Sequence, residues 1–325
     1  MYVPVSGKDS QGNACFSSPN PPFGATFTYY LKETIKTKKD IRKDAEAEAI
    51  KKKEEIKYPT TDELRLEDDE IAPYLVFTIT DESGNIVRRL KAAATAGISR
   101  ITWDLRYATT NPAWGEGDPF SNNDGLLMAM PGKYKVSIGK VVNGVFTDLG
   151  QSREFNTVLL NNTSLPDADP QGSLAFQKKV AELLRAVQGS INLSNDLTYR
   201  LSSIKQALKN TLYGTDDLMA LTIDLERRNT AIKRQLTGDE TLAKRNENQP
   251  PSISDRVNNV IWGYWRSTSE PTQTMRQDYE IAGNAYTKIL ADQKTMIEKD
   301  LPSIEAKMEQ LKSPWTPWRV PEWQK

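Results

Sequence analysis

The sequence predicts an α+β protein with more than one domain, in which an antiparallel β-sandwich with an inserted charged helix precedes a long antiparallel helical bundle. Three observations support this prediction. Up to about residue 160, apolar and polar residues alternate in short segments, which is the period of strands. From about Pro170, apolar residues recur at spacings of three and four, which is the period of helices. The length of 325 residues is enough for two domains.

The first half of the chain is expected to form six or seven short strands. In residues 24–31, Phe27, Tyr29 and Leu31 share one face, and threonine side chains lie on the other. Turn-forming sequences such as DESGN and VNGV separate the later segments. Further strands are predicted at 74–80, 86–90, 98–107, 133–139 and near 153–160. Short strands with turns between them are typical of an immunoglobulin-like sandwich.

A highly charged segment separates the first two of these strands. Good helix formers, with opposite charges four residues apart at Glu48 and Lys52, predict a solvent-facing helix over about 34–58. A partner-docking helix is the alternative. We interpret the acidic run that follows as a solvated approach to the next strand. It could offer oxygen ligands to calcium, but it lacks the alternating spacing of a calcium loop. Its members are Asp62, Glu63, Glu67, Asp68, Asp69 and Glu70.

Four helices are expected in the second half. The first runs for roughly 40 residues from about Pro170, either unbroken or broken near Gly189. Gly214 ends it, and Thr215 begins the second helix. The apolar positions expected to face inward on the second helix are Leu218, Leu221, Leu225, Ile232 and Leu236.

The third helix is shorter and can be capped by Ser252 or Ser254, and the fourth begins at Pro271. Pro302 is expected to kink the fourth helix because proline removes a backbone donor. Its inward face is expected to include Ile289, Gln293, Ile297, Leu301, Ile304 and Met308. The four apolar stripes can cover one another in an antiparallel three-layer bundle, so we expect a monomer.

The domain organisation follows from these elements. We predict an extended linker at 1–23, a sandwich at 24–165, a bundle at 170–312 and a Trp/Pro-rich strap at 313–325.

The composition excludes several kinds of site. The 43 Lys and Arg residues are balanced by 43 Asp and Glu residues, which argues against a nucleic-acid binder driven by counterion release. There is no histidine, so Ser–His–Asp and Cys–His catalysis and His-ligated metal sites are excluded. The single cysteine, Cys15, excludes internal disulfides and Cys-cluster zinc. No stretch approaches the length of an apolar membrane span, and no cofactor is expected.

Carboxylates are the remaining abundant acid–base groups. The loop at 111–120, NPAWGEGDPF, places Trp114 beside Glu116 and Asp118. A glycosidase needs two carboxylates roughly 5–10 Å apart, and a stacking aromatic often accompanies them, so these three residues are the candidates for catalysis and ligand contact. We favour the other interpretation, in which this is a surface loop with acidic turn residues and one anchored tryptophan.

The remaining tryptophans fall into two groups. Trp103, on a strand that also contains Asp104 and Arg106, is expected to fill the core, and Asp104 and Arg106 can pair on the opposite face. Trp262 and Trp265 share a helix face, where core packing is expected.

The tail is less ordinary. Residues 313–323, SPWTPWRVPEW, interleave three prolines with Trp315, Trp318 and Trp323. Prolines favour an extended chain, and exposed tryptophan is unfavourable, so we expect an ordered strap that docks on the protein's own surface. The alternatives are a docking strap for a partner domain and a glycan platform.

Several segments together resemble a bacterial family. They are NPPFGATFTYYLKE (20–33), ITWDLRY (101–107), PGKYKVSI (131–138) and the Trp/Pro-rich end. The chain is similar to the C-terminal region of large exported Bacteroidetes proteins described as sortilin-like or BNR-repeat glycosyl hydrolases, in which an upstream β-propeller contains the repeats. The stretch from GNIVRRL to PGKYKVSI also resembles the immunoglobulin-like domain of flagellar hook-capping proteins.

The resemblance implies an accessory role in an exported protein. The hydrolase label belongs to the propeller, and no catalytic motif of the family maps onto this chain. We therefore expect a non-catalytic module that packs on or presents a propeller, or that binds a protein partner. The alternative is a carbohydrate-binding or carboxylate-dependent glycoside hydrolase module. Residues 1–15 lack the basic and apolar regions of a signal peptide, which fits a cytoplasmic protein or a part of an exported one.

Overall fold

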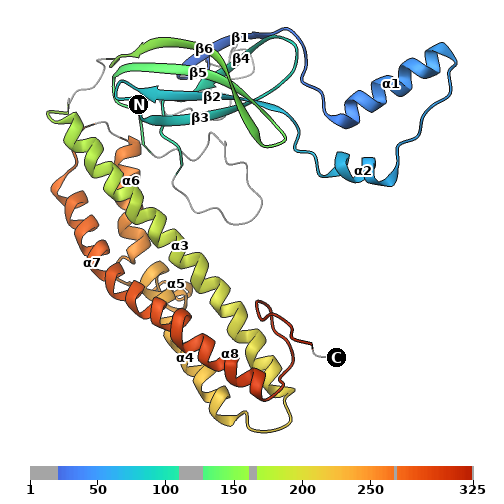
Figure 1. The fold of residues 1–325 in the computed structure, drawn as a ribbon. Helices are drawn as coiled ribbons and strands as arrows, with labels where there is room; N and C mark the ends of the chain where they lie inside the picture. Colours follow the sequence, from blue (N-terminus) through green and yellow to red (C-terminus); the bar gives the residue numbers. More distant parts are fainter. Residues whose placement is uncertain (1–20, 110–126, 161–166, 267–268, 324–325) are drawn as a thin grey trace, which may run out of the picture. The chain divides into compact units, whose positions relative to one another are not determined.

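A computed structural model describes residues 21–109, 127–160, 167–266 and 269–323 (Figure 1). The chain divides into two compact units. The strand unit comprises mainly residues 2–162, and the helical unit begins at Thr163. The linker predicted at 1–23 falls almost entirely outside the described residues.

The strand unit contains two antiparallel sheets. Its strands are β1 (Ala25–Leu31), β2 (Tyr74–Asp81), β3 (Ile86–Ala93), β4 (Gly97–Trp103), β5 (Gly132–Val142) and β6 (Val145–Thr157). β1 pairs with β4, and the other four strands follow the order β3-β2-β5-β6 (Figure 1). The predicted hairpin is confirmed, because β2 and β3 pair directly across the turn after Asp81. The mixed class of helices and antiparallel strands is confirmed as well.

Both sheets contribute to one apolar core. Trp103 lies at its centre, and its ring meets Tyr134 edge-on with the centroids 5.2 Å apart. The alternation predicted for β1 is confirmed, since Phe27 and Tyr29 pack against this core and the intervening threonines are exposed. The buried members are Leu75, Phe77, Ile79, Val87, Leu90, Ala94, Trp103, Tyr134 and Val136. Burial raises the pKa of Tyr134 to about 12, and its hydroxyl donates to the carbonyl of Met130 at 2.6 Å.

The strand predicted at 98–107 ends four residues early. After Trp103, the side chain of Asp104 accepts a hydrogen bond from the backbone nitrogen of Arg106 at 3.1 Å, and Leu105 adopts a φ of 59°. The indole nitrogen of Trp103 donates to the carbonyl of Arg106 at 2.8 Å. This turn brings the chain out of the strand, so the predicted side-by-side placement of Asp104 and Arg106 on a strand face was wrong.

The last strand begins earlier than predicted. β6 starts at Val145, directly after the turn at Asn143-Gly144, rather than near residue 153. Its first seven residues are exposed and show no alternating burial, and a bulge interrupts the pairing opposite Ile138 and Gly139. The first half of this edge strand buries neither face and therefore lacks the period-two pattern on which the prediction depended.

The inserted charged segment forms two helices. α1 (Lys38–Lys52) confirms the predicted helix, and α2 (Thr61–Asp68) was not predicted. The signal for α2 is a capping box, in which Thr60 and Glu63 bond reciprocally to each other's backbone nitrogen. The acidic run is therefore helical as far as Asp68, while Asp69 and Glu70 follow the helix, and none of its members is buried.

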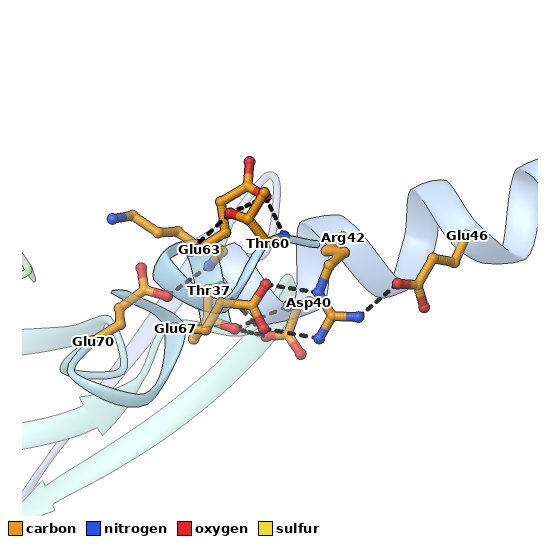
Figure 2. Close-up of polar contacts among 9 residues, drawn as sticks. Thr37, Asp40, Arg42, Glu46, Thr60, Glu63, Glu67 and Glu70 are labelled. Atoms are coloured by element: carbon orange, nitrogen blue, oxygen red, sulfur yellow. Dashed lines mark hydrogen bonds and ion pairs between the residues drawn. The ribbon is translucent and has the colours of Figure 1, made fainter. Parts of the chain in front are cut away.

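Polar contacts hold α2 against α1 (Figure 2). Arg42 donates from Nε and Nη2 to the two carboxylate oxygens of Glu67, at 2.7 and 2.8 Å, and from Nη1 to Glu46 at 2.6 Å. The backbone nitrogen of Lys38 donates to Glu70 at 2.6 Å. Neither helix contains a buried residue. The acidic residues considered as calcium ligands at Glu63, Glu67 and Glu70 are thus engaged in bonds within the pair.

We expect acid to separate α2 from α1. Hydrogen bonds from Arg42 lower the pKa of Glu67, and bonds from Thr60 lower the pKa of Glu63. A carboxylate whose pKa is lower in the folded state stabilises that state above its unfolded pKa, about 4.3 for Glu, and the stabilisation is lost as the pH falls through the folded value. The α-carbon chemical shifts of 61–68 should therefore move toward coil values below about pH 4.

Glu67→Gln should produce the same shifts at neutral pH, and Glu54→Gln is the matched control outside these contacts. Helical shifts that persist in α2 down to the pH at which the whole chain unfolds would contradict this account.

The helical unit confirms the long helices that were predicted. It contains α3 (Pro170–Lys209), α4 (Asp216–Thr237), α5 (Glu240–Lys244), α6 (Ile253–Arg266), α7 (Gln273–Thr295), a π-helical turn η1 (Met296–Asp300) and α8 (Leu301–Gln310). α3 runs through Gly189 without a break. Ser252 rather than Ser254 caps α6, because its hydroxyl accepts from the backbone nitrogen of Asp255 at 3.1 Å.

Helix α3 packs against α4, α6 and α7, and α4 also contacts α8 (Figure 1). Most of the predicted inward positions are buried, among them Leu218, Leu225, Ile232 and Leu236 on α4. Leu221 and Trp262 are exposed, so the prediction that they pack in the core was wrong. Each lies on a helix whose other apolar residues already fill the inward stripe.

The fourth predicted helix is one continuous path that contains a π turn. Met296 is fully buried where Ile297 was predicted to face inward. The turn ends at Asp300, two residues before Pro302, which lies in the first turn of α8. Proline has no backbone donor, so residue 302 cannot form the backbone hydrogen bond of a regular helix, and the π turn lies just before this position.

Candidate binding surface at the C-terminal strap

The strap at 313–323 folds back onto the helical unit. Ser313 and Thr316 are buried. The backbone nitrogen of Ser313 donates to the carbonyl of Met308 at 2.9 Å, and the hydroxyl of Thr211 at the end of α3 donates to that of Ser313 at 2.9 Å. Small polar residues therefore anchor the strap. The three tryptophans of the strap were expected to pack against the protein's own surface, but they remain substantially exposed.

Trp318 lies against α3. Its ring meets Tyr199 edge-on with the centroids 5.7 Å apart, and the guanidinium carbon of Arg200 lies 5.4 Å from the ring centroid. Arg200 in turn donates to Glu305 of α8 at 2.9 Å. The residue is 54% exposed, so these contacts cover one part of Trp318 and the rest faces solvent. Trp318 adopts a φ of 70°, which turns the strap at this point.

Trp315 is supported by an arginine of the strap itself. The guanidinium carbon of Arg319 lies 4.9 Å from the centroid of the Trp315 ring. The Arg319 side chain is only 4% exposed. It donates from Nε to Glu309 of α8 at 2.9 Å and from Nη1 to the carbonyl of Pro314 at 2.9 Å. Trp315 is itself 45% exposed.

We define the aromatic surface as Tyr199, Trp315 and Trp318. The two arginines beside it, Arg200 and Arg319, are paired with Glu305 and Glu309 of α8. The aromatic surface is therefore partly apolar, and the charges of both arginines are balanced. Trp323, the third tryptophan of the strap, is 80% exposed and has no described contact with this surface. The sequence indicated the tryptophans but not Tyr199 or Arg200, which lie between inward positions of α3 and show no distinguishing pattern.

The other predicted site lies outside the described residues. Trp114, Glu116 and Asp118 all fall in the segment 110–126. Within the part of the chain that the structure describes, no group of three acidic, histidine or cysteine side chains could hold a metal ion. The same part contains no helix with the length and apolarity needed to cross a membrane.

Searches of family models, curated proteins and solved structures find no match for this chain.

Proposed function

We propose that this chain is a non-catalytic binding module and that the aromatic surface is its contact face. The observation that supports this proposal is the support given to Trp315 and Trp318. Each ring lies beside an arginine that is hydrogen-bonded to a carboxylate of α8, and each tryptophan residue is about half exposed. Aromatic residues dominate the binding energy of protein interfaces, and a surface fixed before binding loses less entropy on association.

The scaffold belongs to the same proposal. We infer that the two sheets form an immunoglobulin-like β-sandwich, because they share one core around Trp103. We infer likewise that α3, α4, α6, α7 and α8 form a helical bundle, since each contacts at least one of the others. In line with the family resemblance, the module would belong to a larger exported protein and would pack on or present a β-propeller.

A neutral glycan is the second candidate ligand. Arg200 and Arg319, the arginines beside the aromatic surface, are each paired with a glutamate, so their charges would not attract an ionic partner. Sugar rings have apolar faces and no net charge, so such a surface could accept them. The catalytic alternative to both binding proposals is a glycoside hydrolase that uses the carboxylates of Glu116 and Asp118.

Co-purification tests the leading proposal. The chain would be mixed with a purified β-propeller domain from an exported protein whose C-terminal region contains the NPPFGA and TWDLRY segments. We expect the two to co-elute in size-exclusion chromatography, and Trp318→Ala and Trp315→Ala to weaken the complex about tenfold or more, as expected for loss of an aromatic interface anchor. Trp262→Ala is the matched control, because Trp262 is 57% exposed but lies on α6.

Two results would contradict this proposal. Co-elution that survives both strap substitutions would place the contact elsewhere, and a saturable change in tryptophan fluorescence with neutral oligosaccharides, lost in Trp318→Ala, would favour the glycan instead. Steady turnover of glycosides that is abolished by Glu116→Gln or Asp118→Asn would show that the chain is an enzyme.

A further inference from the structure

The π turn changes which residues of α8 face the interior. Before the turn, the buried positions follow one another at three or four residues and end at Ile289, Gln293 and Met296. The next buried residue is Leu301, five positions later, and regular spacing resumes at Ile304. The backbone nitrogen of Leu301 donates to the carbonyl of Met296, which is the i to i+5 bond of a π turn. The turn therefore absorbs one extra residue.

A regular helix through this point would present the wrong residues to the core. Four residues after Met296 comes Asp300, and the same face would continue through Ser303 and Lys307. With the extra residue absorbed, that face carries Leu301, Ile304 and Met308, all of which are buried. Each residue of an α-helix corresponds to a rotation of about 100°, so the π turn rotates α8 by that amount relative to α7.

Arg228 on α4 distinguishes the two rotations electrostatically. Its guanidinium pairs with Asp292 before the turn and, at 2.6 Å, with Asp300 at its end. The hydrogen bonds that Arg228 donates to Asp292 and Asp300 raise the pKa of Arg228. Asp292 and Asp300 are eight residues apart in the sequence. The π turn absorbs one of these residues, and the remaining seven correspond to about two full turns of a regular helix, so both aspartates lie on the same face. In a helix without the π turn, Lys299 would occupy the position that faces Arg228.

The rotation of α8 also places the supports of the aromatic surface. Glu305 and Glu309 are four residues apart and so lie on the same face of α8. Glu305 accepts a hydrogen bond from Arg200, whose guanidinium lies over the ring of Trp318. Glu309 accepts a hydrogen bond from Arg319, whose guanidinium lies over the ring of Trp315. A rotation of α8 by one residue would move Glu305 away from Arg200 on α3, and it would move the strap, whose Ser313 is bonded to the carbonyl of Met308, relative to Tyr199 and Arg200.

We propose that Arg228 and the π turn set the rotation of α8 and thereby assemble the aromatic surface. Arg228 is then a positioning residue for that surface, although it lies on α4 and contacts neither tryptophan in the described structure. The inference depends on the proposed function only in treating the surface as a binding site. Its test measures the surface without any ligand, so failure of the binding proposal and failure of this one give different results.

The first test reverses the charge at Arg228. Each variant is made with and without Trp318→Phe, so that the difference in fluorescence reports Trp318 alone. We expect Arg228→Glu to raise iodide quenching of Trp318 roughly twofold, because the ring is 54% exposed when supported. Arg227→Glu is the matched control, since Arg227 is the exposed neighbour on the same helix. Combining Arg228→Glu with Asp292→Lys and Asp300→Lys should return the iodide quenching of Trp318 to its level in the unsubstituted protein.

The second test changes the number of residues in the turn. Deleting Glu298 in a Pro302→Ala background should give a regular helix with the same inward face, and Trp318 should stay protected. Inserting one alanine after Glu298 should rotate α8 by a further 100° or so and expose Trp318 to iodide.

Three outcomes would overturn the proposal: equal quenching in Arg228→Glu and Arg227→Glu, no rescue by the reversed pair of aspartates, or a protected Trp318 after the insertion. If Arg228→Glu lowers the helical circular dichroism of the chain, Arg228→Gln replaces it, because glutamine removes the charge without adding a repulsive one. Trp318 in Arg228→Gln should again be more quenched than in Arg227→Gln, and equal quenching would count against Arg228.

Discussion

Replacing Trp103 with alanine is expected to lower the free energy of unfolding of the strand unit by about 3–5 kcal/mol. The side chain is fully buried. It belongs to β4 of the two-stranded sheet, and its ring contacts Tyr134 and Phe155 of the four-stranded sheet, so it links the two sheets. Its removal leaves a large cavity in the core, and it also leaves the carbonyl of Arg106 without the indole donor. Chemical denaturation followed by far-UV circular dichroism measures the loss.

Trp103→Phe separates the two contributions. Phenylalanine retains much of the aromatic packing but cannot donate to Arg106, so its effect should fall clearly below that of alanine. Trp262→Ala serves as the control on an exposed tryptophan and should change stability by no more than about 0.5 kcal/mol. Equal effects of the alanine substitutions at Trp103 and Trp262 would show that the described core is wrong.

Gly24→Ala should be nearly as damaging, although it adds only one methyl group. Gly24 has a φ of 126°, which side chains rarely adopt, and a β-carbon at this position would overlap the carbonyl oxygen of Trp103 on the paired strand. Strained backbone conformations cost of order 1–3 kcal/mol, and the overlap adds the cost of separating β1 from β4. We expect a loss of more than about 2 kcal/mol in the free energy of unfolding.

Gly84→Ala isolates the conformational part of this effect. Gly84 also has a positive φ, of 82°, but an added β-carbon there meets nothing within 4 Å. The difference between the two alanine variants therefore measures the overlap with Trp103 together with the more restricted φ of Gly24. If Gly84→Ala destabilises as much as Gly24→Ala, the close approach of the two strands contributes nothing.

Periodic patterns predicted those elements that bury one face. β1 and the hairpin of β2 and β3 have alternating inward residues, and the long stripe of α3 shows the helical spacing throughout. Elements without a buried face were less predictable. α2 buries no residue, and the first half of β6 is exposed on both faces, so neither produces a period in the sequence. For α2, the capping pair of Thr60 and Glu63 was the available signal.

The π turn shows a second reason why the spacing of apolar residues did not predict the whole structure. The stripe expected through Ile289, Gln293, Ile297 and Leu301 consists of three successive spacings of four. Each such spacing drifts by about 40° around a regular helix, so three of them rotate the face by roughly 120°. The structure removes this drift by burying Met296 and absorbing a residue before Leu301. Adding the rotations along the stripe, rather than matching single spacings, would have revealed the conflict.

The candidate site was predicted only in part. Composition singled out Trp315 and Trp318, but their supports come from residues far away in the sequence. Arg200 and Glu305 are more than a hundred positions apart, and only the fold of the helical unit brings their side chains together. Such pairing leaves no local pattern that could be recognised in one sequence.

The polar attachment of α1 and α2 also affects how the chain should melt. Because neither helix buries a residue, their unfolding exposes little new apolar surface and contributes little to the change in heat capacity. Helical signal from this pair should therefore fade over a broad range of temperature before the main transition. Fitting the circular dichroism of the whole chain to a single two-state curve would then give a van't Hoff enthalpy below the calorimetric one.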